Sequence, residues 1–429
     1  MNYNQNHKLN QLDEQILIIG VDVSKKFHVA RAQDYRGVEF KKGIKFDNTL
    51  GGFIQFSSWK ELLMKEEKKT KVIVGMEPTG PYWLPFARWL QKEGLWIVTV
   101  NPAHVKKSKE LDDNNQAKTD YRDARVIAQL VKDARFSEPN LLAGIYEELR
   151  NAKNIRKVMV NDLKRIKNRM ANWLDRYFPE YKDGYVNWEA ESFCYLMRKY
   201  KLPEVLAKQD PEELYKEVKE KFPRGVGCRK ISSLIKASRE SIGVKNGTRM
   251  AARELDYLLK RYKEIVSEIN EIEVEINGLC EELPEVRKIT QIKGMGMTTA
   301  SGIVAELGEI KKYQTPKQMI KMAGLALTEN SSGQKKGKMS ISKRGRKDLR
   351  KILYQAVVGM IRTNGAFQEL YEYYRYRAKN QLSGKQAIIV LVTKLLRIIH
   401  TIVVKEENYD EKKMMSSIRH PEEFVLVAS

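Results

Sequence analysis

The sequence predicts a two-part fold: an α/β domain with a mixed sheet, followed by a mainly helical region. Three short apolar runs, at residues 16–23, 71–76 and 96–100, are rich in β-branched side chains and too short for ordinary buried helices. Helical patterns alternate with them, which is typical of an α/β domain. Beyond about residue 142 the strand signals vanish and only helical patterns remain.

The N-terminal elements follow in order from periodicity and turn residues. Ile16–Val23 (ILIIGVDV) is an almost continuous apolar run and predicts a central strand. Two shorter strands are expected at His28–Gln33 and Val38–Phe46, on either side of a turn at Asp34–Gly37. Buried strands are then expected at 71–76 and 96–100, and helices at 50–65, 81–93, 102–109 and 120–134.

The middle of the chain carries the sharpest helical periodicity. Steps of three and four residues alternate along one apolar series, which predicts a coiled-coil seam. The series is Leu255, Leu258, Tyr262, Ile265, Ile269, Ile272, Ile276 and Leu279. An oligomer is the expectation from this seam. An antiparallel partner upstream in the same chain, or a helix packed on its own domain, remains open.

These patterns divide the chain into five stretches. Residues 1–14 are expected to be a flexible leader and 15–141 the α/β catalytic domain. Residues 142–282 form the helical linker and oligomerisation region, and 283–405 the C-terminal domain. Residues 406–429 read as a polar, mobile tail.

Composition points to a polyanionic partner. The chain has 78 Lys and Arg against 55 Asp and Glu, a formal net charge of +23, and nucleic acid is the partner that best neutralises such a surplus. An anionic membrane is the competing partner, but no basic amphipathic helix stands alone. The three cysteines are far apart, so neither a disulfide framework nor a zinc site is expected. Without a signal peptide or a membrane-spanning run, the expected location is the bacterial cytoplasm, in association with the nucleoid.

Four carboxylates form the candidate metal site. Asp22 interrupts an apolar strand, where an unpaired carboxylate is costly to bury. Glu77 directly follows the strand at 71–76, and Asp120 and Asp123 start a helix three residues apart, on one face. Such a set suits hard divalent cations, and a pair of Mg²⁺ ions can activate a nucleophile on a phosphodiester. Taken alone, Asp120 would be an ordinary first-turn acid.

The strand order together with these carboxylates is that of a ribonuclease-H-like (RuvC-like) fold. Asp112 and Asp113 are nearby alternatives, but they fall in a polar loop and are expected to be solvated.

The C-terminal region carries two further motifs. Residues 292–308 (IKGMGMTTASGIVAELG) contain a Gly-x-Gly turn leading into a helix, which resembles the helix-hairpin-helix motif of DNA-binding proteins; a simple tight turn is an equal alternative. Residues 331–350 hold eight Lys or Arg and one Asp in a glycine-interrupted loop that suits a phosphate backbone. A serine in this loop could be a nucleophile if a metal or a base activates it.

Several motifs together resemble one family. VGMEPTGPYW, KTDYRDA, the strand-borne Asp22 and the series IKGMG…AGLA…SSG…G…ISKRG are similar to the DEDD transposases of bacterial insertion sequences that a bridge RNA guides. That family also includes the Piv-type DNA invertases. The resemblance covers nearly the whole chain, with a less familiar segment at Tyr181–Gly247 that could be an insertion.

The resemblance implies the site residues and the partners. It places the metal-binding tetrad, with Mg²⁺ or alternatively Mn²⁺, on Asp22, Glu77, Asp120 and Asp123, and the nucleophile on Ser332, with Ser331 as the alternative. It implies donor and target DNA, a non-coding bridge RNA whose base pairing reads sequence, and a homo-dimer or homo-tetramer in which one protomer's carboxylates activate another's serine. Six basic residues are expected to hold phosphates: Lys335, Lys336, Lys338, Lys343, Arg344 and Arg346.

Three rival functions stay open. A site-specific invertase would use the same chemistry with a different outcome, and a junction-resolving nuclease would use water in place of the serine. A catalytically silent nucleic-acid-binding protein is expected to lack a carboxylate, and none of the four is missing.

Overall fold

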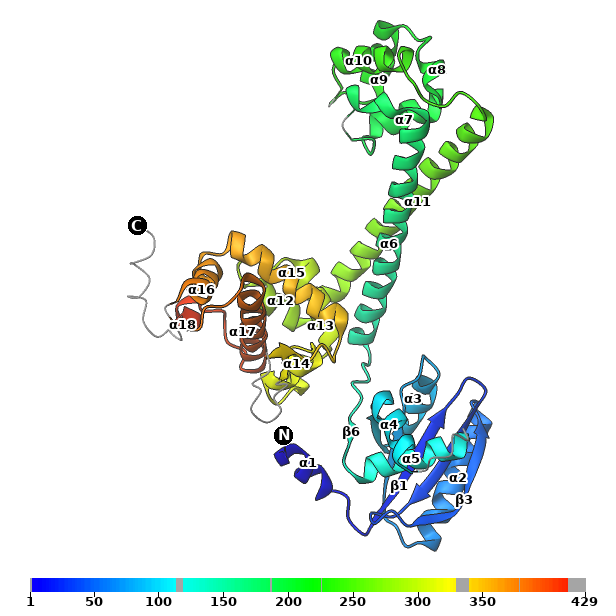
Figure 1. Ribbon diagram of the computed structural model, residues 1–429, viewed down its shortest axis with the longest axis vertical. Helices are drawn as coiled ribbons and strands as arrows, with labels where there is room; N and C mark the ends of the chain where they lie inside the picture. Colours follow the sequence, from blue (N-terminus) through cyan, green and yellow to red (C-terminus); the bar gives the residue numbers. More distant parts are fainter. Residues whose placement is uncertain are drawn as a thin grey trace. The chain divides into compact units, whose positions relative to one another are not determined.

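The computed structural model describes residues 2–112, 119–185, 187–224, 226–328, 339–377 and 379–415, and it divides into two compact units, 1–141 and 142–429. Each unit has its own hydrophobic clusters and is described by itself below (Figure 1).

The N-terminal unit is built on a six-stranded mixed sheet of order β3-β2-β1-β4-β5-β6. Strands β1, β4 and β5 are parallel, while β2, β3 and β6 are antiparallel to their neighbours. The strands are β1 (Ile16–Val23), β2 (Phe27–Gln33), β3 (Glu39–Asp47), β4 (Lys71–Met76), β5 (Trp96–Val100) and β6 (Phe136–Ser137). The predicted mixed α/β domain is confirmed.

Helices cover both faces of this sheet. They are α2 (Leu50–Glu66), α3 (Trp83–Lys92), α4 (Pro102–Asp112) and α5 (Asp120–Lys132), and a further helix, α1 (Asn2–Leu9), precedes the first strand. Leu17, Ile19 and Val21 of β1 pack with aromatic side chains of α2 and α3 on one face. Ile16 and Ile18 pack with α5 on the other. This alternation follows from the two-residue period of a strand and decides where the site residues lie.

The first fourteen residues differ from the expected flexible leader. They contain α1, and Lys8 Nζ donates a hydrogen bond of 2.6 Å to the carbonyl of Phe136. Gln5 Nε2 donates to the carbonyl of Asp133, and Leu12 is buried in the cluster beneath α5. The polar composition of this segment predicted a solvated leader. The same amide and ammonium side chains instead make the hydrogen bonds that hold it to the domain.

The second unit begins with two long helices that pack along each other. They are α6 (Ile145–Tyr177) and α11 (Thr248–Glu281). Near one end of the pair, Trp173 Nε1 donates to the carbonyl of Ala251 at 3.0 Å; nearer the other, Arg156 Nε donates to Glu273 at 2.8 Å. The two helices are therefore antiparallel, as Figure 1 also shows.

The apolar series of α11 packs against α6 of the same chain. Ile265, Ile269, Ile272 and Ile276 are all buried in clusters shared with α6. The seam consequently gives no ground for the expected dimer or tetramer, because its apolar side chains are already covered. Periodicity reports that a helix has a partner, but not which chain supplies it.

A small helical cap connects the two long helices. It comprises η1 (Pro179–Asp183), α7 (Glu191–Tyr200), α8 (Pro203–Leu206), α9 (Pro211–Lys221) and α10 (Cys228–Arg239). Tyr185, Phe193, Leu196 and Leu234 of the cap are fully buried and join α6 and α11 in one cluster. The less familiar segment is thus a folded part of the helical unit.

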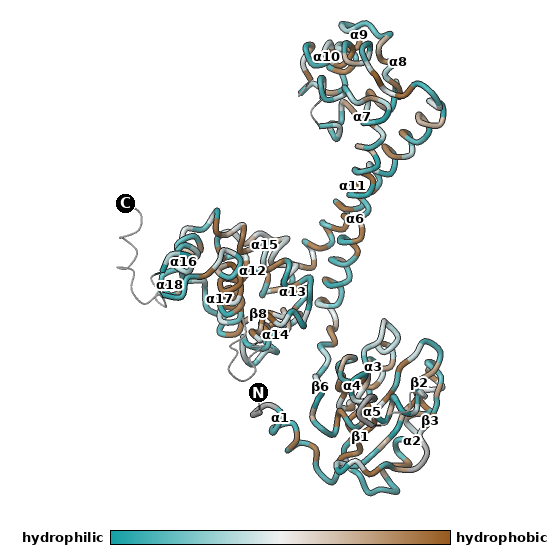
Figure 2. The backbone as a smooth tube through the Cα atoms, in the orientation of Figure 1, coloured by the Kyte–Doolittle hydropathy of each residue, from teal (hydrophilic) through white to brown (hydrophobic). Residues whose placement is uncertain are grey.

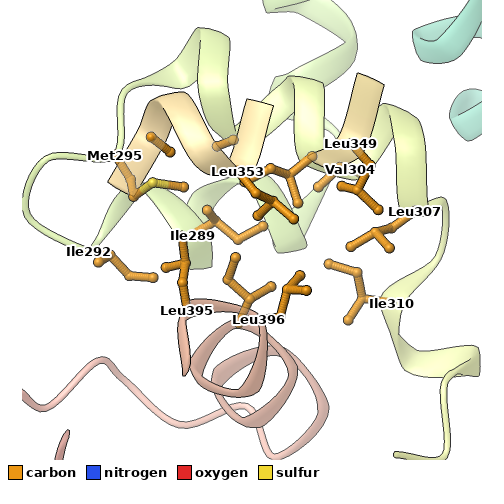
Figure 3. Close-up of a cluster of buried hydrophobic side chains, with 14 of the residues drawn as sticks. Ile289, Ile292, Met295, Val304, Leu307, Ile310, Leu349, Leu353, Leu395 and Leu396 are labelled. Carbon is orange, nitrogen blue, oxygen red and sulfur yellow. The ribbon is translucent and has the colours of Figure 1, made fainter. Parts of the chain in front are cut away.

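The remaining helices form a second cluster around α17, as Figure 3 shows for Leu395 and Leu396 with Leu353 and Ile289. The elements are α12 (Pro284–Thr290), α13 (Met297–Leu307), η2 (Ile310–Lys312), α14 (Pro316–Met322), β7 (Leu327–Thr328), β8 (Ser340–Ile341), α15 (Lys347–Thr363), α16 (Gly365–Tyr376), α17 (Gly384–Val404) and α18 (Glu411–Met415). Met414 of α18 is buried in this cluster, so the expected polar tail contributes to the core at least to that point.

Helix α17 is long and apolar enough to cross a membrane by length and composition, with a mean hydropathy of 2.2 over its most apolar window. It is the one such helix in the described residues. Figure 2 shows its hydrophobic colouring. Its side chains from Leu391 to Val403 supply much of the cluster's interior, and a Ser383–Gln386 capping box begins it. Core packing accounts for its hydropathy, as in buried helices of globular domains.

Candidate active site

Asp22 and Glu77 lie at the same edge of the N-terminal sheet. Strands β1 and β4 are parallel, with Val21 opposite Met76, so the next residue of each strand is one of the two carboxylates. Both side chains are half-buried. The side-chain period of two places Asp22 on the face of Ile16, Ile18 and Gly20, which is the face that α5 covers. Glu77 continues the alternation of Ile73 and Gly75 on that same face.

Helix α5 brings the second pair of carboxylates. The hydroxyl of Thr119 accepts a hydrogen bond from the backbone N–H of Arg122 at 3.3 Å, so it caps the helix immediately before Asp120. Asp120 is exposed and Asp123 is buried, with 7% of its surface accessible. The helix dipole favours acids in the first turn, which explains two carboxylates here but not the burial of one of them.

Glycines bring α5 unusually close to the sheet. A Cβ atom at Gly20 would lie 2.2 Å from the carbonyl oxygen of Ala124 and 2.4 Å from the nitrogen of Ala128. At Gly75 it would lie 2.3 Å from a methyl of Val131. Ala124 directly follows Asp123, and Gly20 stands two residues before Asp22, so a carboxylate adjoins the closest approach of helix and strand on each side. The first turn of α5 is therefore held over the edge that carries Asp22 and Glu77.

The donor set suits a hard divalent cation. All four side chains offer carboxylate oxygens, the ligands that Mg²⁺ and Mn²⁺ prefer. As the side chains lie, no three His, Cys, Asp or Glu residues in the described ranges come close enough together to hold a metal ion. Glu77 instead accepts a hydrogen bond from the hydroxyl of Thr79 at 3.2 Å. The backbone arrangement thus collects the carboxylates at one edge, but their side chains would have to rotate before three of them could share a metal ion.

Three residues that the sequence analysis did not select lie near this edge. His104 is in the first turn of α4, which directly follows the parallel strand β5, and its Nδ1 is buried without a hydrogen-bond partner. Tyr82 and Tyr121 are exposed aromatic residues next to the Glu77 loop and beside Asp120. The detectable signal was their position, since each follows a parallel strand or adjoins a predicted carboxylate.

The serine loop is held at its base by a short hairpin. Strands β7 and β8 pair antiparallel, with Leu327 opposite Ile341 and Thr328 opposite Ser340. Some of the predicted residues belong to the connecting segment and lie outside the described residues: Ser331, Ser332, Lys335, Lys336 and Lys338.

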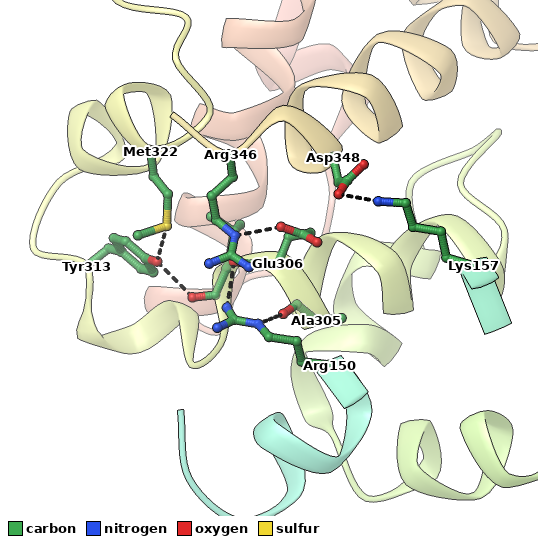
Figure 4. A network of polar contacts seen from close by, with 9 residues as sticks. Arg150, Lys157, Ala305, Glu306, Tyr313, Met322, Arg346 and Asp348 are labelled. Carbon is green, nitrogen blue, oxygen red and sulfur yellow. Dashed lines mark hydrogen bonds and ion pairs between the residues drawn. The ribbon is translucent and has the colours of Figure 1, made fainter. Parts of the chain in front are cut away.

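The other predicted phosphate contacts follow β8. Lys343 and Arg344 are exposed. Arg346 instead pairs with Glu306 through a 2.6 Å contact to Nε (Figure 4). Glu306 is also where Arg150 is anchored, since that guanidinium donates to the carbonyls of Ala305 and Glu306 at 2.8 and 3.0 Å. Burial is the main cause that lowers the pKa of Arg150 to about 10. Arg346 therefore has a structural role in joining α15 to α13.

The Gly-x-Gly motif lies in the turn between α12 and α13. Gly294 has a φ of 93°, and a Cβ there would lie 3.0 Å from Thr363 Oγ1, so glycine is required by the turn itself. Gly296 precedes α13 without a side-chain cap, and a Cβ there would meet nothing within 4 Å. Gly294 thus supports the tight-turn interpretation. At Gly296 no side chain of the described residues caps or covers the first backbone N–H groups of α13.

Two family models match the chain. A DEDD transposase model named for IS110 matches residues 19–179, and a model described as the IS116/IS110/IS902 transposase family matches residues 286–372. Together they cover more than half of the chain and include all four carboxylates and the serine loop. Most of the helical cap lies between the two matches.

Curated relatives carry similar descriptions. The "Insertion element IS110 uncharacterized 43.6 kDa protein" of Streptomyces coelicolor is 22% identical over 71% of this chain and 74% of its own length. The "Transposase for insertion sequence element IS1328" of Yersinia enterocolitica is 34% identical over 24% of this chain and 31% of that protein. The "Pilin gene-inverting protein" of Moraxella bovis is 29% identical over 29% of this chain and 38% of that protein.

Proposed function

Because this chain belongs to the IS110/IS116/IS902 family of transposases, we propose that it cuts and rejoins DNA at a metal-dependent carboxylate site, with Ser332 as the nucleophile. The observation that carries the proposal is the placement of Asp22 and Glu77 at adjacent strand ends beneath the first turn of α5. The strand order β3-β2-β1-β4-β5 supports the RuvC-like assignment of this domain.

The carboxylates are proposed to hold the cation and to position the DNA phosphate. Asp123 is the buried member of the four, and Asp22 and Asp123 lie next to the closest approach of β1 and α5. Asp120 is exposed and Glu77 is half-buried just past the end of β4, so we propose that their side chains rotate toward the other two carboxylates. A bound Mg²⁺ or Mn²⁺ ion supplies Lewis-acid polarisation of the phosphodiester and favours deprotonation of the attacking hydroxyl.

The proposed attack by the serine is a transesterification, in which one phosphate ester replaces another. The Ser332 hydroxyl loses its proton and forms a serine–phosphorus ester, while the bond from phosphorus to one deoxyribose oxygen breaks and that oxygen leaves as a sugar hydroxyl. Attack by a sugar hydroxyl of another DNA end reverses the step, which releases the serine and joins the DNA without an external energy source. Ser331 is the alternative nucleophile.

The nucleic-acid partners are proposed from the resemblance and the charge. Donor DNA, target DNA and a bridge RNA would together neutralise a net charge of +23. Isolation of the protein from cells with its flanking DNA element, followed by sequencing of bound RNA, tests this part. A single abundant non-coding RNA from the element is expected; only random cellular RNA would contradict guidance.

The catalytic test uses supercoiled DNA carrying the element ends, with Mg²⁺. Asp22→Asn and Glu77→Gln are expected to reduce cleavage by about 100-fold or more, as loss of a group that stabilises developing charge does. Glu93→Gln, an exposed acid that begins the turn after α3, is the matched control and is expected to cleave normally. Normal cleavage by Asp22→Asn would overturn the carboxylate site.

The nucleophile is tested by trapping the protein–DNA link. Denaturing gels of the wild-type reaction are expected to show DNA covalently attached to protein, and Ser332→Ala is expected to abolish that band. If Ser332→Ala cleaves at the normal rate without an adduct, the chain acts as a water-using nuclease, as a junction resolvase would.

Site-specific inversion is a second candidate outcome of the same chemistry. It is favoured by the similarity to the pilin gene-inverting proteins of two Moraxella species. Sequencing of products from a plasmid with two sites in inverted orientation separates inversion from insertion.

A further inference from the structure

A polar groove lies within the helical unit. It has a volume of about 460 Å³ and is formed by one face of α6, by the α12–α13 turn with α13, and by one face of α15. We propose that this groove binds the phosphate backbone of duplex DNA. The proposal rests on the proposed function, because a DNA-recombining enzyme has to hold its substrate outside the reacting phosphate.

Charge is the first argument. The basic side chains that line the groove are Lys153, Arg156, Lys157, Lys164 and Lys351. Its acidic lining residues are Glu306 and Asp348, and both are already paired, Glu306 with Arg346 and Asp348 with Lys157 at 2.6 Å each (Figure 4). The groove therefore carries a net positive charge.

Two of these cations make no ion pair in the described part of the chain. Lys164 and Lys351 are exposed, on α6 and α15 respectively, and both line the groove. Exposed ammonium groups without a protein partner are the kind that displace counterions from DNA. They are the residues that the test below removes.

Spacing is the second argument. Lys153, Lys157, Asn161 and Lys164 recur every three or four residues, so they follow a single face of α6. At 1.5 Å of rise per residue, this row is about 16 Å long. One strand of B-form DNA presents a phosphate every 3.4 Å of axis, so the row spans about five phosphates. A small metabolite would not need a row of this length.

The α6 side of the groove is fixed by polar contacts to α13 and α11. Lys153 Nζ donates hydrogen bonds of 3.1 Å to the carbonyl of Thr298 and to the hydroxyl of Ser301. Arg156 is fixed by Glu273 of α11. The groove is thus lined mainly by three packed helices, with Gly294 of the α12–α13 turn beside them.

The surface between the walls is shaped for close approach. Gly359 lies inside α15 and lines the groove, and a Cβ there would meet nothing within 4 Å. Glycine is among the least favourable residues in a helix interior, and here no packing contact requires it. Asn154, Asn161, Thr298 and Gln355 line the groove as well, and amide and hydroxyl groups of this kind commonly contact phosphate and sugar.

The first test measures the salt dependence of DNA binding by the full chain. Fluorescence anisotropy with a non-specific B-form duplex, in EDTA, removes catalysis from the measurement. Lys164→Ala/Lys351→Ala is expected to reduce the slope of log affinity against log salt by about 1.8, since each phosphate contact contributes about 0.9. Alanine is a strong helix former, so both helices should persist.

The matched control removes two lysines from elsewhere in the same unit. Lys216 of α9 and Lys263 of α11 are exposed, make no ion pair in the described residues, and do not line the groove. Lys216→Ala/Lys263→Ala has the same net charge as the test variant and is expected to keep the wild-type slope. Equal slopes for the two double variants would overturn the proposal.

A second pair of variants places a side chain in the groove at Gly359. Gly359→Ala should bind DNA as the wild type does, whereas Gly359→Glu places a carboxylate in the groove and is expected to weaken binding by about tenfold or more, since like charges across an interface repel. Both residues favour a helix over glycine, so a folding defect is not expected. Unchanged binding by Gly359→Glu would contradict the assignment.

Two further arms separate this proposal from others. An RNA duplex of the same length is measured in parallel; loss of RNA binding with unchanged DNA binding would overturn DNA as the occupant. Asp22→Asn is expected to bind the duplex normally in EDTA and to fail in cleaving the element-end plasmid with Mg²⁺. Failure of the groove variants to alter binding would leave the carboxylate result intact, and the reverse also holds.

Discussion

A methyl group added at Gly20 would test whether the close approach of α5 to β1 positions the carboxylates. The Cβ atom of Gly20→Ala would lie 2.2 Å from Ala124 O and 2.4 Å from Ala128 N, both backbone atoms that cannot rotate away. Ordinary contact requires about 3.4 Å, so α5 has to move outward by about 1 Å. Overpacking of this kind costs about 1–3 kcal/mol.

The same displacement of α5 should lower the rate of DNA cleavage strongly, while most of the chain remains folded. Asp123 is the residue before Ala124, so it moves with the helix relative to Asp22. A misplacement of about 1 Å in a catalytic constellation can lower the rate by about 100-fold. Cleavage of the element-end plasmid and chemical unfolding should both be measured on the full chain, at a temperature at which wild type and variant are folded.

Gly51→Ala is the control for this substitution. Gly51 is in α2 of the same unit, and the nearest atom to its added Cβ is Thr49 Oγ1 at 4.0 Å. It should be as active as the wild type and slightly more stable, because alanine restricts the unfolded chain. If Gly20→Ala retained both wild-type stability and wild-type cleavage, the helix–strand contact would not position the site.

Three other predictions follow from single features. Burial lowers the pKa of His28, so the unfolded chain takes up a proton near pH 6.5 that the folded chain does not. The free energy of unfolding of the N-terminal unit should therefore fall as the pH drops below about 6.5. His28→Phe should remove this contribution to the pH dependence. Ile265→Ala in the seam should cost about 2–5 kcal/mol in chemical unfolding while leaving the oligomeric state in light scattering unchanged; dissociation of a complex would show that the seam joins chains. Burial raises the pKa of Cys194 to about 11, so a thiol-alkylating reagent at pH 7.5 should label exposed Cys228 first, and faster labelling of Cys194 would contradict its burial.

Much of the N-terminal domain could be predicted because its signals are local. The run ILIIGVDV fixed the central strand, and the bounds expected for β4 and β5 agree with the structure residue for residue. The two-residue period also decides which face Asp22 occupies, once α5 is known to cover Ile16 and Ile18. Local periodicity was sufficient for these elements.

Features that depend on a distant partner could not be predicted in the same way. The seam of α11 has the same pattern whether α6 or another chain covers it. Helix α1 is held by side-chain bonds to carbonyls about 128 residues away. The groove of α6, α13 and α15 joins residues from 153 to 359, each of which alone reads as an ordinary solvated helix position.

The central claim is that Asp22, Glu77, Asp120 and Asp123 form one divalent-metal site. Electron paramagnetic resonance of Mn²⁺ titrated into the full chain, without DNA, measures binding of a divalent metal at this site directly. Wild type and Glu93→Gln are expected to bind Mn²⁺ alike, and Asp22→Asn/Asp123→Asn is expected to lose that binding while remaining folded. Equal Mn²⁺ binding by all three proteins would contradict the account.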